Sequence, residues 1–279
     1  MSVFRDGGRR AAAVIVAAAL LFVTACAAEG DPAAGPGSAS SSPTATETSA
    51  PSEPPMPSAA DYPDGIVPNG PSTIGADPYI RSTIADDDDA MQYDPSLAPS
   101  DVKAAFTEDQ LSDALQFVVR FLAENYVDTP LINSAAGDGK AWFEQNKGVL
   151  NPKGHDDYLM RLSTPAGARS VPGPADGPVI PALNFMDGDA VLEVVYSQDE
   201  PRVTERNINL NDITLSTSGD AISFYFDLES RMQATEANGD RPFWLYTTGP
   251  AELVVIANPD GGWYIADYKY DLHGVTQSK

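Results

Sequence analysis

The spacing of apolar residues changes along this chain, from a helical period before residue 130 to an alternating period after residue 182. Thr107 and Gln110 form a capping box, the residue pair that closes the first turn of an α-helix. Apolar residues then recur at spacings of three and four, which places them on one helical face. That face consists of Leu111, Leu115, Val118 and Leu122, widened by Phe117 and Phe121. The sequence therefore predicts a helix packed on a broad apolar surface.

Two long strands are predicted around a Ser-Gly-Asp turn at residues 218–220. In the second strand, the even-numbered residues from 222 to 228 are apolar and share one face. In the first strand, Ile208 is on an even position and Ile213 on an odd one. A regular strand with one buried face cannot hold both, so we expect a bulge or sharp bend near Asn211–Asp212.

The remaining segments are shorter and predict two helices, a loop, a strand and a hairpin. The loop carries five prolines and three glycines within residues 163–181, which excludes regular structure. The expected elements are a helix around Trp142 and Phe143, a helix within residues 154–164, a strand at 190–197 and a hairpin at 251–272 about Pro-Asp-Gly-Gly.

Helices followed by a run of antiparallel strands predict an α+β domain. This order, together with the expected bulge, resembles the NTF2-like (cystatin-like) group, in which a curved antiparallel sheet wraps N-terminal helices. The resemblance covers about residues 104–273 and contains no sequence motif. It implies a pocket between helix and sheet, and it permits isomerase or dehydratase chemistry there.

The first 26 residues have the three parts of a secretory signal. Arg5, Arg9 and Arg10 give a positive start, and residues 11–23 form an uncharged apolar run of thirteen. A membrane-spanning helix needs roughly 20 such residues. The run ends in Val23-Thr24-Ala25-Cys26, which resembles the lipobox of bacterial lipoproteins, and the alanine-rich signal is similar to those of actinobacteria.

The lipobox resemblance implies that residues 1–25 are a signal peptide and that the Cys26 thiol receives a diacylglyceryl group. Each buried methylene contributes about 0.8 kcal/mol, and two or more chains hold a protein stably on a membrane. Two alternatives stay open: Cys26 as an ordinary small residue near a cut site, and the segment as an uncleaved anchor. All three place the domain outside the cytoplasm, and the lipobox resemblance implies attachment to the extracytoplasmic face of the cell membrane. Since Cys26 is the only cysteine, the domain must fold without disulfides.

Residues 26–100 predict a low-complexity, mostly disordered tether ahead of a single domain at residues 101–279. Met56 is the only large apolar side chain within residues 27–60, too little to offset the entropy of ordering them. Residues 61–100 carry scattered aromatic and aliphatic side chains, so short pieces could lie against the domain. The run Asp86–Asp89 predicts a solvated charge cluster, because a calcium loop needs spaced acids, a glycine and a closing glutamate.

The chain is acidic in both halves, with a net charge of −23. Residues 27–100 hold twelve acidic side chains and one basic, and residues 101–279 hold 27 acidic and 13 basic. No cluster of Lys and Arg occurs. Nucleic-acid binding, which depends on neutralising phosphates, is excluded, as is electrostatic attraction to anionic lipid.

Few residues in the sequence indicate chemistry. His155 and His273 are the two histidines, far apart, whereas a zinc site needs three or four ligands. No Gly-x-Ser-x-Gly elbow and no glycine-rich phosphate loop occur, although a Ser-His-Asp triad needs no local motif. No metal and no cofactor are therefore expected, and the catalytic residues, if there are any, are unknown from the sequence.

Asp227 is the candidate acid or base for an NTF2-like pocket, with Tyr225 on the same face of its strand. Such a role needs a shifted pKa inside an apolar cup. The face of Phe224 and Phe226 lies opposite, so the simpler interpretation of Asp227 is a solvent-facing polar residue.

Tyr264, Tyr268 and Tyr270 share one parity of an aromatic strand. A row of tyrosines can form a platform for a sugar or a peptide. The competing interpretation is a core face whose hydroxyls reach the rim.

These observations predict a membrane-anchored lipoprotein whose domain is a non-catalytic binding module. Its partner would be an envelope protein, a glycan or a small ligand, held in the NTF2-like cup or on the exposed sheet. The alternative is an enzyme of the isomerase, dehydratase or hydrolase kind that uses a pocket carboxylate. A transport receptor fits poorly, because two α/β lobes do not fit into residues 101–279.

Overall fold

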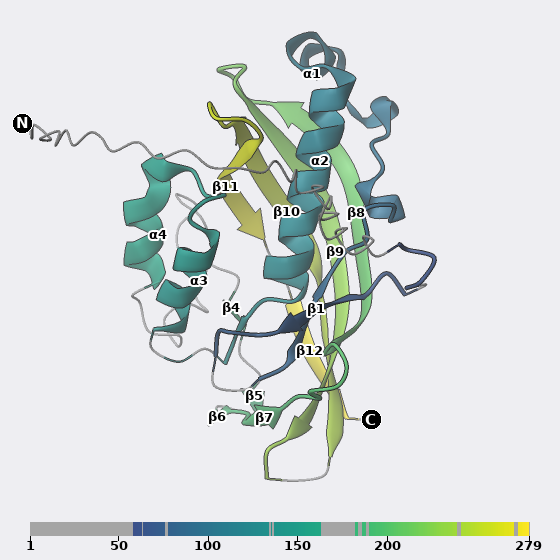
Figure 1. Ribbon diagram of the computed structural model, residues 1–279, viewed down its shortest axis with the longest axis vertical. Helices are drawn as coiled ribbons and strands as arrows, with labels where there is room; N and C mark the ends of the chain where they lie inside the picture. Colours follow the sequence, from purple (N-terminus) through teal and green to yellow (C-terminus); the bar gives the residue numbers. More distant parts are fainter. Residues whose placement is uncertain are drawn as a thin grey trace, which may run out of the picture. The chain divides into compact units, whose positions relative to one another are not determined.

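Long antiparallel strands form the centre of the molecule, and helices cover one of their faces (Figure 1). The computed structural model describes residues 58–62, 64–75, 78–133, 135, 137–162, 182–183, 186–187, 190–238, 241–270 and 273–278. For residues 160–162, 182–183, 186–187, 190–191 and 273–278 the description covers the backbone alone. All these residues belong to one unit that begins at Glu53.

The N-terminal half of this unit contains most of the helices. Its elements are β1 (Val67–Pro71), β2 (Ile80–Thr83), the 3-10 turns η1 (Asp89–Met91) and η2 (Pro95–Leu97), α1 (Ser100–Ala105), α2 (Glu108–Leu122), the π-helical turn η3 (Ala123–Val127), β3 (Leu131–Ile132), α3 (Asp138–Asn146), the 3-10 turn η4 (Pro152–Gly154) and α4 (His155–Leu162).

The C-terminal half contains the sheet. Its strands are the short β4 (Ala182–Leu183), β5 (Met186–Asp187), β6 (Ala190–Val191) and β7 (Val194–Val195), followed by β8 (Val203–Leu215), β9 (Ala221–Glu236), β10 (Pro242–Ala257), β11 (Trp263–Tyr270) and β12 (His273–Ser278).

The main sheet is antiparallel, with β9 and β10 at its centre. β8 and β7 pair with β9, while β11 and β12 pair with successive parts of β10. The pairing of β8 with β9 shifts by one residue between Leu210 and Asp212. This bulge lets Ile208 and Ile213 both face the core, at 6% and 0% exposure. The bend predicted near Asn211–Asp212 is confirmed.

Helix α2 lies across the inner face of the sheet (Figure 1). Its first turn has the predicted capping box: the Thr107 hydroxyl accepts from the Gln110 amide, and the Gln110 side chain accepts from the Thr107 amide. The predicted apolar face is buried, with Leu111, Leu115 and Leu122 fully inaccessible. The π-helical turn extends the helix, and Asn125 in that turn accepts a hydrogen bond from Trp142 Nε1 at 2.8 Å.

The fold class, α+β with a mostly antiparallel sheet, is confirmed. The helices expected around Trp142 and within residues 154–164 correspond to α3 and α4. The hairpin about Pro-Asp-Gly-Gly joins β10 to β11. The strand expected at residues 190–197 is divided into β6 and β7. The loop at 163–181 and the tether at 26–57 lie outside the described residues.

Residues before 101 contribute to the core, as the alternative of short pieces lying against the domain allowed. Strands β1 and β2 form an antiparallel pair. Side chains spread over residues 67–98 are buried in the same apolar cluster as α2 and the sheet: Ile74, Ile84, Met91 and Ala98. Sparse apolar residues between prolines, glycines and aspartates are sufficient here, because each inserts into a surface that the domain provides.

The acidic run Asp86–Asp89 is largely paired, which corrects its interpretation as a solvated cluster. Asp86 forms an ion pair with Arg120. Asp87 accepts from the Ser58 hydroxyl at 2.8 Å and the Ala59 amide at 2.7 Å. Asp88 caps η1 and lies 3.0 Å from Arg206 Nη2. The run therefore fastens the N-terminal segment, defined as residues 58–98, to α2 and β8.

A buried ion pair forms a second fastening for the same segment. Arg202 and Asp128 are 2% and 0% exposed, and Nε of the arginine lies 2.8 Å from Oδ1 of the aspartate. The other aspartate oxygen accepts from the Ser82 amide at 2.7 Å and the Ser82 hydroxyl at 3.2 Å. The Arg202 guanidinium lies 3.5 Å from the ring centre of Tyr79 and 4.9 Å from that of Tyr196. Both carboxylate oxygens are thus engaged.

Replacing Arg202 by methionine should leave Asp128 buried without its cation. Loss of one partner of a buried pair costs about 3–5 kcal/mol, which urea unfolding measures directly. Lys147→Ala is the matched control, because the Lys147–Glu144 pair is about half exposed and its loss should change the free energy of unfolding far less. A change below about 1 kcal/mol for Arg202→Met would contradict the assigned role.

Candidate ligand-binding groove on the outer face of the sheet

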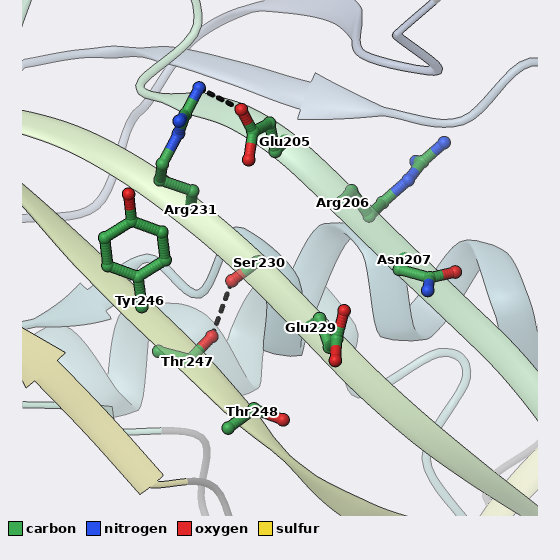
Figure 2. A pocket seen from close by; sticks show the side chains of 9 residues that line it. All are labelled: Glu205, Arg206, Asn207, Glu229, Ser230, Arg231, Tyr246, Thr247 and Thr248. Atoms are coloured by element: carbon green, nitrogen blue, oxygen red, sulfur yellow. Dashed lines mark hydrogen bonds and ion pairs between the residues drawn. The ribbon is translucent and has the colours of Figure 1, made fainter.

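The face of the sheet turned away from α2 carries polar and aromatic side chains in rows across β8, β9 and β10. Strand register sets these rows. Glu205, Arg231 and Tyr246 form one, and Asn207, Glu229 and Thr248 form the next. Figure 2 shows both rows on the near side of the strands, with helix behind them. Alternation along each strand is what places these residues on the outer face.

These rows line a concavity of about 600 Å³. Below it, Ser230 and Thr247 point toward the helix side, where their hydroxyl oxygens lie 2.5 Å apart (Figure 2). This contact satisfies two polar groups that are buried between the strands. The full lining is Glu205, Arg206, Asn207, Glu229, Ser230, Arg231, Tyr246, Thr247 and Thr248.

Three contacts hold the Arg231 guanidinium in place. It forms an ion pair with Glu205 (Figure 2), and its Nε donates to the Thr204 hydroxyl at 3.2 Å. Its charged end lies 4.4 Å from the ring centre of Trp244, a cation–π contact. The side chain remains 26% exposed, so a cation with a fixed position faces the groove. Fixing it in advance lowers the entropy that binding would cost.

Other groups in the groove are available to a ligand. Within the described part of the chain, the Glu229 carboxylate and the Tyr246 hydroxyl have no hydrogen-bond partner. Glu229 and Thr248 are exposed, and Tyr246 is half-buried. A half-buried aromatic ring beside an exposed acceptor and a fixed cation can bind a polar molecule that has an apolar side.

The candidate carboxylate Asp227 lies on the outer face, not between α2 and the sheet. It is exposed and is paired in register with Asn209 and Pro250. Tyr225 shares its face, as expected, and donates to Glu252 at 3.1 Å. Both residues are outside the rows that line the groove, so the structure does not bring them together with Arg231.

The tyrosine row does not form a single surface. The pairing of β10 with β11 shifts between Val254 and Val255, which leaves Ala266 as the extra residue. Tyr268 therefore points into the core together with Ile265, while Tyr264 takes the opposite face. The three tyrosines therefore do not share one face, and for Tyr268, which is 0% exposed, the ligand platform is wrong and the core interpretation is confirmed.

Tyr268 lies in the core, and Tyr270 packs against it. Tyr268 lies 5.4 Å from Tyr126 and 5.9 Å from Tyr158 between ring centres, and Tyr270 lies 5.0 Å from Tyr126. The cluster fills the space between the end of α2, α4 and β11. Edge-to-face and stacked ring pairs of this kind stabilise a core.

Of the two histidines, only His155 has a described side chain. His155 Nε2 lies 3.2 Å from the Leu150 carbonyl, and its ring packs edge-on against Phe143 at 5.2 Å. His273 is in β12, where only the backbone is described. Among the described residues, no group of three or more His, Cys, Asp or Glu is placed to hold a metal ion.

Glu205, Arg231 and Tyr246 were not predicted as site residues from the sequence. A signal was present: Trp244 and Tyr246 alternate with the apolar Phe243 and Leu245, so the strand has an aromatic outer face as well as a buried inner one. Which residues of β8 and β9 lie beside them depends on register, and the sequence alone does not give that register.

Comparison of the chain with protein-family models, with curated proteins and with solved structures finds no match. In the described part of the chain, the helices are too short or too polar to cross a membrane. The function is therefore inferred from the geometry of the groove and from the sequence.

The buried tyrosines give a test by pH. Burial raises the pKa of Tyr79 to about 12, and it raises the pKa of Tyr126 and of Tyr268 well above the ordinary value. The unfolded chain loses these protons near pH 10, whereas the folded chain keeps them. The free energy of unfolding should therefore fall as pH rises from about 10 to 12.

Ultraviolet absorbance of tyrosinate measures this titration. We expect only part of the eleven tyrosines to ionise near pH 10 while the protein stays folded, and the rest to ionise with unfolding. Tyr79→Phe should remove one late-titrating group. Ionisation of all tyrosines in one step near pH 10, before any loss of structure, would contradict the packing described above.

Proposed function

We propose that this protein is a lipid-anchored, exported binding module that holds an envelope ligand in the groove on the outer face of its sheet. The observation that carries the proposal is the fixed Arg231 guanidinium, bordered by Glu205, Trp244 and the half-buried Tyr246. Arg, Trp and Tyr are the residues that contribute most to binding energy in protein interfaces. An envelope protein, a glycan or a smaller polar molecule could present the matching chemistry.

Binding is better supported than catalysis. An acid or base in an active site needs partial burial with one face open to substrate. Asp227 is exposed, and both oxygens of the buried Asp128 are occupied by Arg202 and Ser82. If the protein were an enzyme, its catalytic carboxylate would have to be one other than Asp128 and Asp227.

We also propose that the domain is an NTF2-like variant. Its long α2 against a sheet with bulged long strands supports the assignment. NTF2-like domains have a pocket between helix and sheet. In this domain a cluster of tyrosines fills the space beside the end of α2, and in this respect it differs from that family. For this reason we place the ligand on the outer face.

The lipobox at Val23–Cys26 supports attachment to the extracytoplasmic face of the cell membrane through acyl chains on Cys26. The first described residue, Ser58, follows Cys26 by 32 positions. A chain advances at most about 3.3–3.6 Å per residue, so this connection reaches about 110 Å at full extension. The groove would therefore act within about that distance of the membrane.

Cys26→Ala should abolish incorporation of radiolabelled palmitate and leave the precursor uncut or release protein to the medium. Cys26 is the only cysteine in the chain, so no other thiol can receive the diacylglyceryl group, and the loss should be complete. Gel analysis of labelled cells checks this. Unchanged labelling of the variant would rule out the anchor while leaving the groove untouched.

Photo-crosslinking tests the groove in the intact anchored protein. A photoreactive residue at Thr248 should give a discrete adduct in cells, whereas the same residue at Asp260, exposed on the β10–β11 turn, should give none. Tyr246→Ala combined with Arg231→Ala should reduce the Thr248 adduct about tenfold or more, the usual effect of removing interface anchors. Equal adducts at both positions, or none at Thr248, would contradict the proposal.

A further inference from the structure

The free edge of β8 lies along a second concavity, separate from the outer-face groove. Within the described sheet, β8 pairs with β9 alone. On its other side is a space of about 510 Å³. Residues Arg206–Leu210 form one wall, and the N-terminal segment forms the other with Asp64, Gly65, Asp88, Asp89, Ala90, Gln92 and Leu97.

The backbone of this edge is available for pairing. Among the described residues, no backbone hydrogen bond joins Asn207–Leu210 to the N-terminal segment. An unpaired strand edge is a template for another strand, unless it is short, charged or bent. Here the bulge at Asn211 ends the regular run, which leaves a straight edge of about 13 Å over four residues at about 3.3 Å each.

Side chains along this edge alternate in a way that suits an added strand. Asn207 and Asn209 are exposed, while Ile208 and Leu210 face inward as buried and half-buried residues. Strand addition uses main-chain hydrogen bonds for affinity and alternate side-chain contacts for specificity. The edge therefore provides both elements of that recognition mode.

The N-terminal segment, which forms the opposite wall of this concavity, carries negative charge. Asp64 and Asp89 are exposed, and no salt bridge within the described residues neutralises them. Asp88 and Arg206 neutralise each other across the floor, at 3.0 Å. The wall therefore presents two carboxylates to whatever lies along β8, which favours a cationic occupant.

The preceding part of this chain does not have that chemistry. Residues 27–57 contain four acidic side chains and no lysine or arginine. They would be repelled by Asp64 and Asp89, so the occupant is expected from another molecule.

We propose that an extended basic segment of a partner protein binds here by strand addition, pairing with Asn207–Leu210 of β8 and directing lysine or arginine side chains at Asp64 and Asp89. This site is distinct from the outer-face groove, although Arg206 and Asn207 border both. Because the two sites use different residues for recognition, an experiment can rule out binding at one site and leave the proposal for the other intact.

The test uses the full chain and the peptide Lys-Val-Lys-Val-Lys-Val-amide as probe. Hydrogen–deuterium exchange should show new protection of the backbone amides within residues 207–210, and calorimetry should show binding. A peptide of the same sequence with alternate N-methyl groups keeps the charge and loses half of the donors. It should bind at least tenfold more weakly.

The protein variants separate charge at this site from charge elsewhere. Asp64→Asn with Asp89→Asn should weaken peptide binding about 3- to 10-fold at low salt, with less effect at high salt. Asp260→Asn, a distant exposed control, should have no effect. Equal binding of the N-methylated peptide, equal affinity of the Asp64/Asp89 variant, protection away from β8, or no binding would each overturn the proposal.

Discussion

The buried pair between Arg202 and Asp128 is the contact on which the arrangement of this fold depends. Asp128 follows the π-helical turn, Arg202 precedes β8, and the Ser82 amide of β2 binds the same carboxylate. Three chain segments that are distant in sequence therefore meet at one group. A pair of this kind adds little net stability over apolar packing, but removing one partner is costly. Its role is to determine which segments lie together.

The Arg202–Asp128 pair helps to hold the N-terminal segment in place, and the outer face of the sheet stays exposed. Helix α2 and the N-terminal segment cover the inner face, and tyrosines fill the region beside the end of α2. The outer face then carries ordered rows of polar and aromatic side chains on long paired strands, a rigid support on which binding groups keep their positions. Arg231, held by Glu205, Thr204 and Trp244, is the clearest example.

Structural features that depend on residues close together in the sequence could be predicted, and features that depend on contacts between distant residues could not. The capping box and the β8 bulge follow from residues close together, because Ile208 and Ile213 disagree in parity. The β11 bulge at Ala266 gave no such signal, since aromatic residues occupy both parities of that strand. The N-terminal segment was missed because its apolar residues are sparse and its partners, Arg120, Arg202 and Arg206, are distant in sequence. The groove rows depend on strand register, which hydrophobic alternation does not define.

Native-state hydrogen exchange at the Ser82 amide tests most directly whether residues 67–98 are part of one cooperative fold. This amide donates to the buried Asp128 carboxylate, so it should exchange only when the whole domain unfolds. The predicted result is a free energy of opening for Ser82 equal to that of core amides in β9, such as Phe224. Rapid exchange of Ser82 while Phe224 stays protected would show that the segment opens independently, and it would contradict the fastening role of the buried pair.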